Sequence, residues 1–352
     1  IPKGSPKLPR NIRIFSVTPS GPSNSLTDFS AMLGDQVTQL IAEQGSVSVI
    51  ANESMQKRDY LRSDLVLHTN MLSTNDKSAI RIRLESGFNG NTLWSGVRTV
   101  QSDAIEASSR TEVHKLLNMA VDSTLAEFAE MPNAQDSQMF PAIRSFQAVR
   151  TMFGLGEKNL AMADAMLEQA FEHDPQGIYL GWRAYLRIIF LGERMKKDPE
   201  ATREEAQSFI RNAMEKAPHN SMVLALASYV QCILFRNYSA AFSLAQNSLN
   251  ACAHNPLAWA FQGISRMHLG EIDLAYNNTL YARQISGPGP HKYQLDMLAC
   301  QTASVVGRFD EAIRLGHMVR AAAPDYAPPL RYLSALLLAT NRGEEADKMI
   351  TQ

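Results

Sequence analysis

Residues 256–290 read PLAWAFQGISRMHLGEIDLAYNNTLYARQISGPGP, and this stretch decides the architecture of most of the chain. It contains two helical segments separated at Gly270, because a glycine just after the last periodic residue ends a helix. The prolines at its two ends mark where one unit stops and the next begins. Small residues at Gly263 and Ala275 would allow two helices to approach closely. The stretch therefore predicts a pair of packed antiparallel helices.

The same pattern recurs along the chain with a period near 34 residues. Equivalent alanines are separated by 35, 34, 37 and 34 residues, and the closing prolines by 43, 38, 34 and 34. They are Ala206, Ala241, Ala275, Ala312 and Ala346, and Pro175, Pro218, Pro256, Pro290 and Pro324. Helix–turn–helix content at this period resembles the tetratricopeptide repeat. We expect an all-α superhelix of six helix pairs over residues 139–352, with a degenerate first pair and a shortened last pair.

Residues 11–130 carry a different pattern, in which apolar and polar residues alternate as they do in strands. The predicted strands are Asn11–Thr18, Val47–Ala51, Asp64–Ser73, Ser78–Ser86 and Asn91–Val100, and the predicted helices are Leu26–Gln44 and Thr111–Glu130. A polar loop over residues 74–77 would join two of the strands into a hairpin. The order strand, helix, strand, hairpin, strand, helix predicts a small α+β domain.

The segment ESGFNGNTLWSG, residues 85–96, adds a resemblance to a known family. A polar glycine turn followed by Leu93-Trp94 at the start of a strand is similar to the TolB-like amino-terminal domain, over about 110 residues. The chain departs from the usual apolar-proline start of that family, because Val17-Thr18-Pro19 stands there. The resemblance implies a bacterial sensor region whose effector, a winged helix or a class III adenylate cyclase, lies upstream of Ile1.

The first ten residues, IPKGSPKLPR, are basic and rich in proline, which predicts an extended linker rather than a packed core. A linker suggests that a domain or a membrane helix precedes it. With such an anchor, the chain would be the periplasmic region of an inner-membrane protein. The cysteines Cys232, Cys252 and Cys300 favour the cytoplasmic alternative, because unpaired thiols suit a reducing compartment. We expect all three to be small buried side chains.

Composition argues against several functions. The 352 residues have a net charge of −1, so no basic field would hold nucleic acid. No run of about 18 apolar residues predicts a membrane span. Neither phosphate-binding glycine loops nor HExxH or CxxC motifs occur, and the eight histidines have no metal-ligand spacing. The Ser-x-x-Lys spacing of Ser54 and Lys57 lacks its supporting motifs. We therefore expect no enzyme activity, no metal and no cofactor.

Binding on the inner surface of the repeats is the favoured function. In tetratricopeptide repeats, positions two, five, nine and twelve of each first helix face inward. Counting Trp259 as position four gives Leu257, Ala260, Ile264 and Met267, and the preceding copy gives Val223, Leu226, Val230 and Ile233. Counting from Trp182 gives Arg183 and Arg187, and the fifth copy gives Gln294, Met297, Gln301 and Ser304. The predicted ligand-binding residues are Arg183, Arg187, Trp182, Ile264, Met267, Gln294, Met297 and Gln301.

Two alternatives stay open for these residues. Arg183 and Arg187 are four residues apart on one helix face and could grip a carboxylate or phosphate. They could instead pair with acidic residues of a neighbouring repeat or lie in water. The apolar inner positions could likewise be filled by the amino-terminal domain rather than by a ligand.

We expect the chain to be the sensing region of a bacterial transcriptional regulator, binding a small acidic molecule in the repeat groove or at the domain junction. One alternative is a protein-interaction scaffold that recognises a peptide in the groove. Another is the regulatory region of a class III adenylate cyclase. The expected partners are a small-molecule or peptide ligand and the upstream effector domain, with no direct contact to nucleic acid. The sequence leaves a homodimer open.

Overall fold

The computed structural model describes residues 12–17, 25–51, 64–73, 77–87, 89–101, 107–130, 141–193 and 198–350. The linker over residues 1–10 and the Ser54/Lys57 pair lie outside the described residues. The chain divides into two compact units. The first unit takes in residues 1–148, 166–179 and 285–289, and the second takes in residues 149–165, 180–284 and 290–352.

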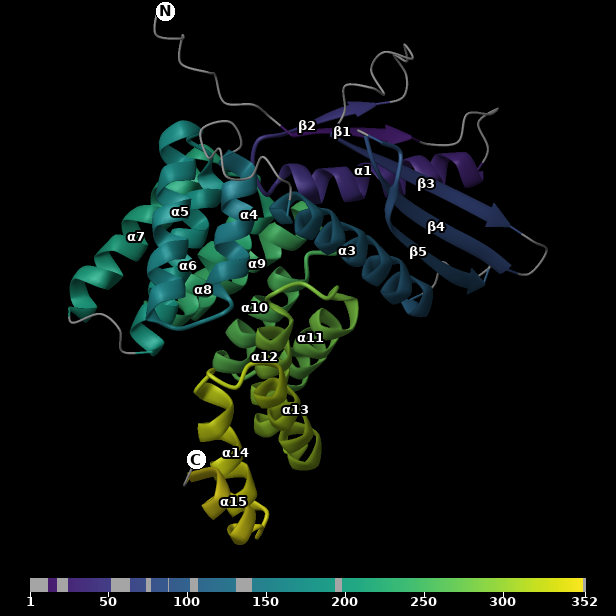
Figure 1. Cartoon of the computed structure of the whole chain (residues 1–352). Coiled ribbons are helices and arrows are strands. Elements are labelled where there is room, and N and C mark those ends of the chain that lie inside the picture. Colours follow the sequence, from purple (N-terminus) through teal and green to yellow (C-terminus); the bar gives the residue numbers. More distant parts are fainter. Residues whose placement is uncertain are drawn as a thin grey trace, which may run out of the picture. The chain divides into compact units, whose positions relative to one another are not determined.

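The first unit contains a five-stranded sheet (Figure 1). Its elements are β1 (Ile12–Val17), α1 (Ser25–Ala42), β2 (Val47–Ala51), β3 (Leu65–Ser73), β4 (Lys77–Ser86), β5 (Thr92–Gln101) and α3 (Ala107–Glu130). The strand order is β2-β1-β3-β4-β5, in which β1 runs parallel to β2 and β3 while β3, β4 and β5 are antiparallel. The predicted α+β fold and its order of elements are confirmed.

Alternation along β4 explains how the sheet is covered. Ile80, Ile82 and Leu84 are buried, while Arg81 between them is exposed. The helix α1 packs on β1, β2 and β3, α3 packs on β4 and β5, and the two helices contact each other. Both helices therefore cover the same face of the sheet, which is the face that buries the apolar side chains.

A short segment from the repeat region belongs to the first unit. The Asn118 side chain of α3 donates a hydrogen bond to the carbonyl of Ile285 at 2.9 Å. The amide of Gly289 donates to a carboxylate oxygen of Asp122 at 2.9 Å. Gly287 also lies against Asp122, with no room for a side chain. Residues 285–289 are therefore held on α3 by backbone contacts that need glycine.

Among the residues that the structure describes, six consecutive helix pairs follow α3, as the 34-residue period predicts. They are α4 (Pro141–Met152), α5 (Glu157–His173), α6 (Gly177–Gly192), α7 (Pro199–Lys216), α8 (Ser221–Ile233), α9 (Tyr238–Ala251), α10 (Pro256–His268), α11 (Ile272–Ile285), α12 (Lys292–Val305), α13 (Phe309–Ala322), α14 (Pro328–Ala339) and α15 (Gly343–Ile350). In the second unit the first helices α8, α10, α12 and α14 contact one another in order (Figure 1). These helices therefore form one continuous layer.

The ends of the repeat helices follow from capping residues. Asn220 and Asn255 both precede a first helix and accept hydrogen bonds from its free amides. Gly270 and Gly307 adopt φ angles of 85° and 84° in the turns after α10 and α12. Glycine suits these turns because it reaches the left-handed region without strain. The predicted end of the first helix at each glycine is confirmed.

Candidate functional site

One small residue in each of three first helices fixes the alignment of the repeats. Ser228, Gly263 and Cys300 face the backbone of the repeat alanines Ala241, Ala275 and Ala312, respectively. The serine hydroxyl donates to its alanine carbonyl at 2.7 Å and the cysteine thiol donates at 3.1 Å. A Cβ on the glycine would lie 2.9 Å from the third carbonyl oxygen. These three positions are therefore equivalent.

This alignment corrects the predicted inner positions of α8. Ser228 is 13 residues from its alanine, whereas Cys300 is 12 residues from its own. The additional residue lies in the turn after α8, where Arg236 has a left-handed φ of 54°. The assignment of Val223, Leu226, Val230 and Ile233 to inner positions is therefore wrong by one residue. Tyr229, not Val230, is equivalent to Ile264.

The arginine pair also lies on a different side of its helix than expected. Gln262 of α10 hydrogen-bonds to the preceding and following second helices, through Gln246 at 3.0 Å and Asn278 at 2.7 Å. Arg183 of α6 lies between second helices in the same way, because it meets Asp164 of α5 and Phe209 of α7. Arg183 is thus equivalent to Gln262, and the residue two positions later, Tyr185, is equivalent to Ile264.

Both guanidinium groups already have carboxylate partners. Arg183 Nε donates to Asp164 at 2.9 Å, and Arg187 donates to Asp164 at 2.7 Å and to Glu205 at 2.8 Å. Both arginines also stack on the ring of Phe209. Burial raises the pKa of Asp164, but the hydrogen bonds and charges of Arg187 and Arg183 outweigh it and lower the pKa overall. Of the two alternatives, pairing of the arginines with acidic residues of the adjacent second helices describes this geometry. A ligand-binding role for Arg183 and Arg187 stays a prediction.

Four tyrosines gather where the first helices meet, and we name them the tyrosine cluster: Tyr185 of α6, Tyr229 of α8, Tyr293 of α12, and Tyr326 before α14. The rings of Tyr185 and Tyr229 stack with centroids 5.8 Å apart. The rings of Tyr293 and Tyr326 meet edge to face at 5.1 Å. Phe153 joins the two pairs, since its ring centroid is 6.0 Å from that of Tyr185 and 6.1 Å from that of Tyr293.

Gln294 is the polar centre of the tyrosine cluster. Its side-chain amide lies near the hydroxyl groups of Tyr185 and Tyr229 and partly opposes the rise that burial causes in their pKa values. Its other polar atom, Oε1, is buried and has no hydrogen-bond partner among the described residues. A buried acceptor without a partner is costly and calls for an explanation, such as a group that donates to it in a complex.

The cluster is neutral at physiological pH. Burial raises the pKa of all four tyrosines above the usual value of the phenol. Burial lowers the pKa of the nearby His291 to about 4. The hydroxyl groups therefore remain protonated and act as hydrogen-bond donors and acceptors rather than as bases. Two charged residues act on Tyr326 from outside the cluster, since Glu193 raises its pKa and Arg331 lowers it.

The structure brings some of the predicted residues to the cluster and leaves others apart. Trp182 is buried edge to face against Tyr185, with centroids 5.6 Å apart, and Gln294 lies at the centre. Ile264 and Met297 are fully buried, whereas Met267 and Gln301 are half-buried. The four tyrosines were not predicted from the sequence. The signal available was that Tyr185 and Tyr229 become equivalent once the repeats are aligned on the small residues.

Other kinds of site find no support in the part of the chain that the structure describes. Within it, no group of three or more His, Cys, Asp or Glu residues is placed to hold a metal. The three cysteines are buried, as expected, and form no disulfide, and burial raises the pKa of Cys232 and Cys300 to about 11. Such thiols are poor nucleophiles. None of the helices described is long and apolar enough to cross a membrane.

Comparison with known proteins gives structural neighbours only. No protein-family model and no curated protein matches the sequence. A thermophilic TPR protein from Thermus thermophilus is 20% identical, covers 54% of this chain and 98% of its own, and has a TM-score of 0.42. PilW, a type IV pilus biogenesis factor, is 15% identical, with 59% and 90% covered and a TM-score of 0.42. A tetratricopeptide repeat protein from Parabacteroides merdae is 16% identical, with 69% and 88% covered and a TM-score of 0.41.

Two of these three neighbours are described as tetratricopeptide repeat proteins. Because the identities and the TM-scores are low, they carry no inference about activity. The assignment of α4 to α15 to tetratricopeptide-type repeats rests on the chain itself, through the period near 34 residues, the six helix pairs described and the equivalent small residues.

Proposed function

We propose that the chain is a protein-interaction scaffold whose second unit binds a peptide segment at the tyrosine cluster. One observation carries the proposal: Gln294 Oε1 is a buried acceptor with no partner among the described residues, set among neutral tyrosines. A backbone or side-chain N–H of a bound peptide would satisfy this acceptor and remove the cost of leaving it unpaired. Helical repeats commonly bind extended segments on the surface that their first helices form.

The chemistry of the cluster suits a peptide better than a free acid. Tyrosine offers a rigid ring for apolar contact and a hydroxyl that both donates and accepts. Tyr326 is half-buried and lies in the turn before α14, so it is the member through which the cluster reaches solvent. The residues selected for an acidic ligand, Arg183 and Arg187, are instead held by Asp164 and Glu205.

The narrower proposal remains that of a sensing region in a bacterial regulator. It includes a TolB-like amino-terminal domain, an effector upstream of Ile1, and a periplasmic or cytoplasmic location. That proposal rests on the sequence resemblance alone, whereas the scaffold proposal also rests on the geometry of the repeats.

The test is selection of binding peptides from a displayed library of random 12-residue peptides, each of which spans roughly 40 Å when extended. The affinity of a selected peptide is then measured by fluorescence anisotropy with the full chain and two variants. We expect Gln294→Leu to weaken binding about tenfold, because one hydrogen bond to a buried acceptor is lost. The control is Gln284→Leu, the same change at an exposed position on α11.

Unchanged binding by Gln294→Leu, or a library that yields no binder, would refute the proposal. Circular dichroism of both variants shows whether each keeps the helical content of the parent, so that loss of binding is separated from loss of folding.

A further inference from the structure

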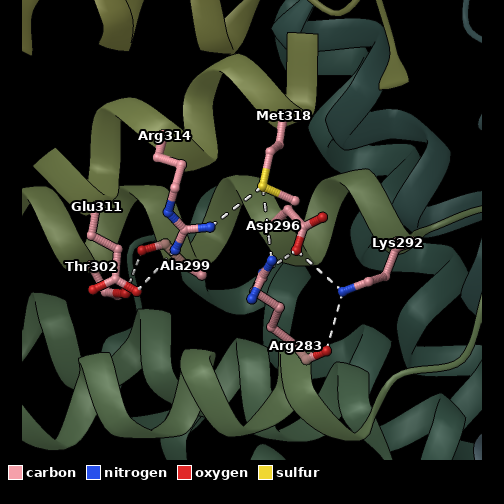
Figure 2. Close-up of polar contacts among 8 residues, drawn as sticks. All are labelled: Arg283, Lys292, Asp296, Ala299, Thr302, Glu311, Arg314 and Met318. Atoms are coloured by element: carbon pink, nitrogen blue, oxygen red, sulfur yellow. Dashed lines mark hydrogen bonds and ion pairs between the residues drawn. The ribbon is translucent and has the colours of Figure 1, made fainter. Parts of the chain in front are cut away.

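Two guanidinium groups converge on the sulfur of Met318 in α13. Arg283 Nη2 lies 4.0 Å from this sulfur and Arg314 Nη1 lies 3.6 Å from it (Figure 2). The two nitrogens come from different helices, α11 and α13. Elsewhere in the described residues Met119 and Met349 each meet a single arginine. Met318 is therefore distinguished by having two donors.

An acidic residue lies beside each arginine. Arg283 Nε donates to Asp296 at 2.6 Å, and Lys292 donates to the same carboxylate at 3.2 Å (Figure 2). Arg314 lies 3.8 Å from Glu311 on its own helix. Arg283 thus directs one N–H group to a carboxylate and another to the sulfur, whereas Arg314 meets its carboxylate, Glu311, only as an ion pair and is 57% exposed. The contact with Asp296, and not Met318 alone, therefore orients the Arg283 guanidinium.

A thioether sulfur is a weak acceptor for such donors. Oxidation would place an oxygen on the sulfur, between the two nitrogens, and a sulfoxide oxygen is a strong, polar acceptor. The Met318 side chain is 41% exposed, so an oxidant can reach it. We propose that Met318 is an oxidation site whose sulfoxide is held by Arg283 and Arg314. This inference is independent of peptide binding at the tyrosine cluster.

The reaction requires a peroxide as oxidant, and hydrogen peroxide suffices. A sulfur lone pair attacks one peroxide oxygen, the S–O bond forms and the O–O bond breaks. The transferred oxygen gives up its proton to the departing hydroxide, which leaves as water. Sulfur loses two electrons and the peroxide gains them. The product gains one oxygen atom, with no change in charge.

The sulfoxide would join two helices that the thioether joins weakly. Its oxygen would accept hydrogen bonds from Arg283 on α11 and from Arg314 on α13. Charged donors form the stronger class of hydrogen bond. Oxidation at this position would therefore stabilise the α11–α13 contact. By contrast, oxidation of a methionine in a packed core disrupts that core.

The first test is oxidation of the full chain by dilute hydrogen peroxide, followed by peptide mass mapping. Met162 of α5 is the internal control, because it is also 41% exposed and no hydrogen bond to its sulfur is found among the described residues. We expect Met318 and Met162 both to gain one oxygen. A chain in which Met162 is oxidised and Met318 is not would overturn the proposal.

The second test compares thermal unfolding of the oxidised parent with that of oxidised Met318→Leu. Every other methionine meets the same oxidant in both chains, so the difference between their shifts on oxidation isolates position 318. Oxidation is expected to raise the midpoint of the parent relative to Met318→Leu by about 2–4 °C. The same pair of chains is then compared with Arg314→Gln added to both; Arg314 is exposed, so this substitution should not affect folding. In this background we expect oxidation to raise the midpoint by at most half as much. An equal gain without Arg314, or no gain in the parent, would contradict the proposal.

Discussion

Asp122 shows how a single buried carboxyl sets a pH response. Burial raises its pKa from 3.8 to about 7, and the hydrogen bond from Gly289 opposes this only in part. The folded chain therefore keeps this proton up to about pH 7, whereas the unfolded chain releases it near pH 4. Stability falls as pH rises through that interval, because the folded state binds more protons there.

The substitution Asp122→Asn tests this response. Asparagine keeps an oxygen for the Gly289 amide and cannot ionise, so the variant should lose the fall in stability between pH 4 and pH 7. At pH 8 the variant should be the more stable chain, and at pH 4 the two should be close. Urea unfolding at a series of pH values measures this. Parallel pH profiles for parent and variant would show that Asp122 is not the group responsible.

Gly287 gives a second prediction at the residue scale. A methyl group there would collide with the Asp122 carboxylate and approach the Asn118 carbonyl oxygen to 2.9 Å. We expect Gly287→Ala to lower the free energy of unfolding by about 1–3 kcal/mol through this overpacking. Gly343→Ala is the matched control, since a Cβ there meets nothing within 4 Å. Denaturant unfolding compares the two, and equal effects would refute the account of residues 285–289.

At the scale of elements, the turn after each first helix explains why two helix ends were predicted correctly and the inner face of α8 was not. Gly270 and Gly307 mark two turns correctly, because only glycine enters the left-handed region freely. The turn after α8 uses Arg236 instead and is one residue longer, so counting by a fixed period misplaced the inner face of α8. The period predicts that helices pair, but it does not resolve a shift of one residue.

This turn offers a direct prediction. Arg236→Gly should raise the free energy of unfolding by about 1 kcal/mol, because it removes the strain of a left-handed φ on a residue with a Cβ. The reverse substitution, Gly270→Ala, should lower it by a similar amount, since a Cβ there meets no neighbour and only the φ of 85° is unfavourable. Chemical denaturation measures both, and effects of the same sign would contradict this explanation.

The contact between α5, α6 and α7 depends on one carboxylate. Asp164 serves two buried guanidinium groups, whereas Glu205 serves one and is half exposed. We expect Asp164→Asn to cost about 3 kcal/mol, because it leaves buried charge incompletely paired. Glu205→Gln should cost no more than about 1 kcal/mol, as for an exposed pair. A larger loss for Glu205→Gln in equilibrium unfolding would contradict this order.

At the scale of the whole molecule, composition and periodicity were sufficient to predict a small mixed sheet followed by helix pairs. They were insufficient for the candidate site. Tyr293 and Tyr326 lie far from Tyr185 in sequence, and only the stacking of first helices brings them together. Gln294 was predicted from its inward position, but its unpartnered oxygen depends on the tyrosines around it. The TolB-like resemblance of the amino-terminal region stays a prediction.

The most direct test of the scaffold proposal is photo-crosslinking of a selected, labelled peptide to the chain. A benzophenone amino acid replaces Tyr326 in one variant and Phe309, 41% exposed at the start of α13, in another. Our account predicts crosslinking from position 326 and none from position 309. Crosslinking at 309 alone, or none at 326 while the peptide still binds, would contradict binding at the tyrosine cluster.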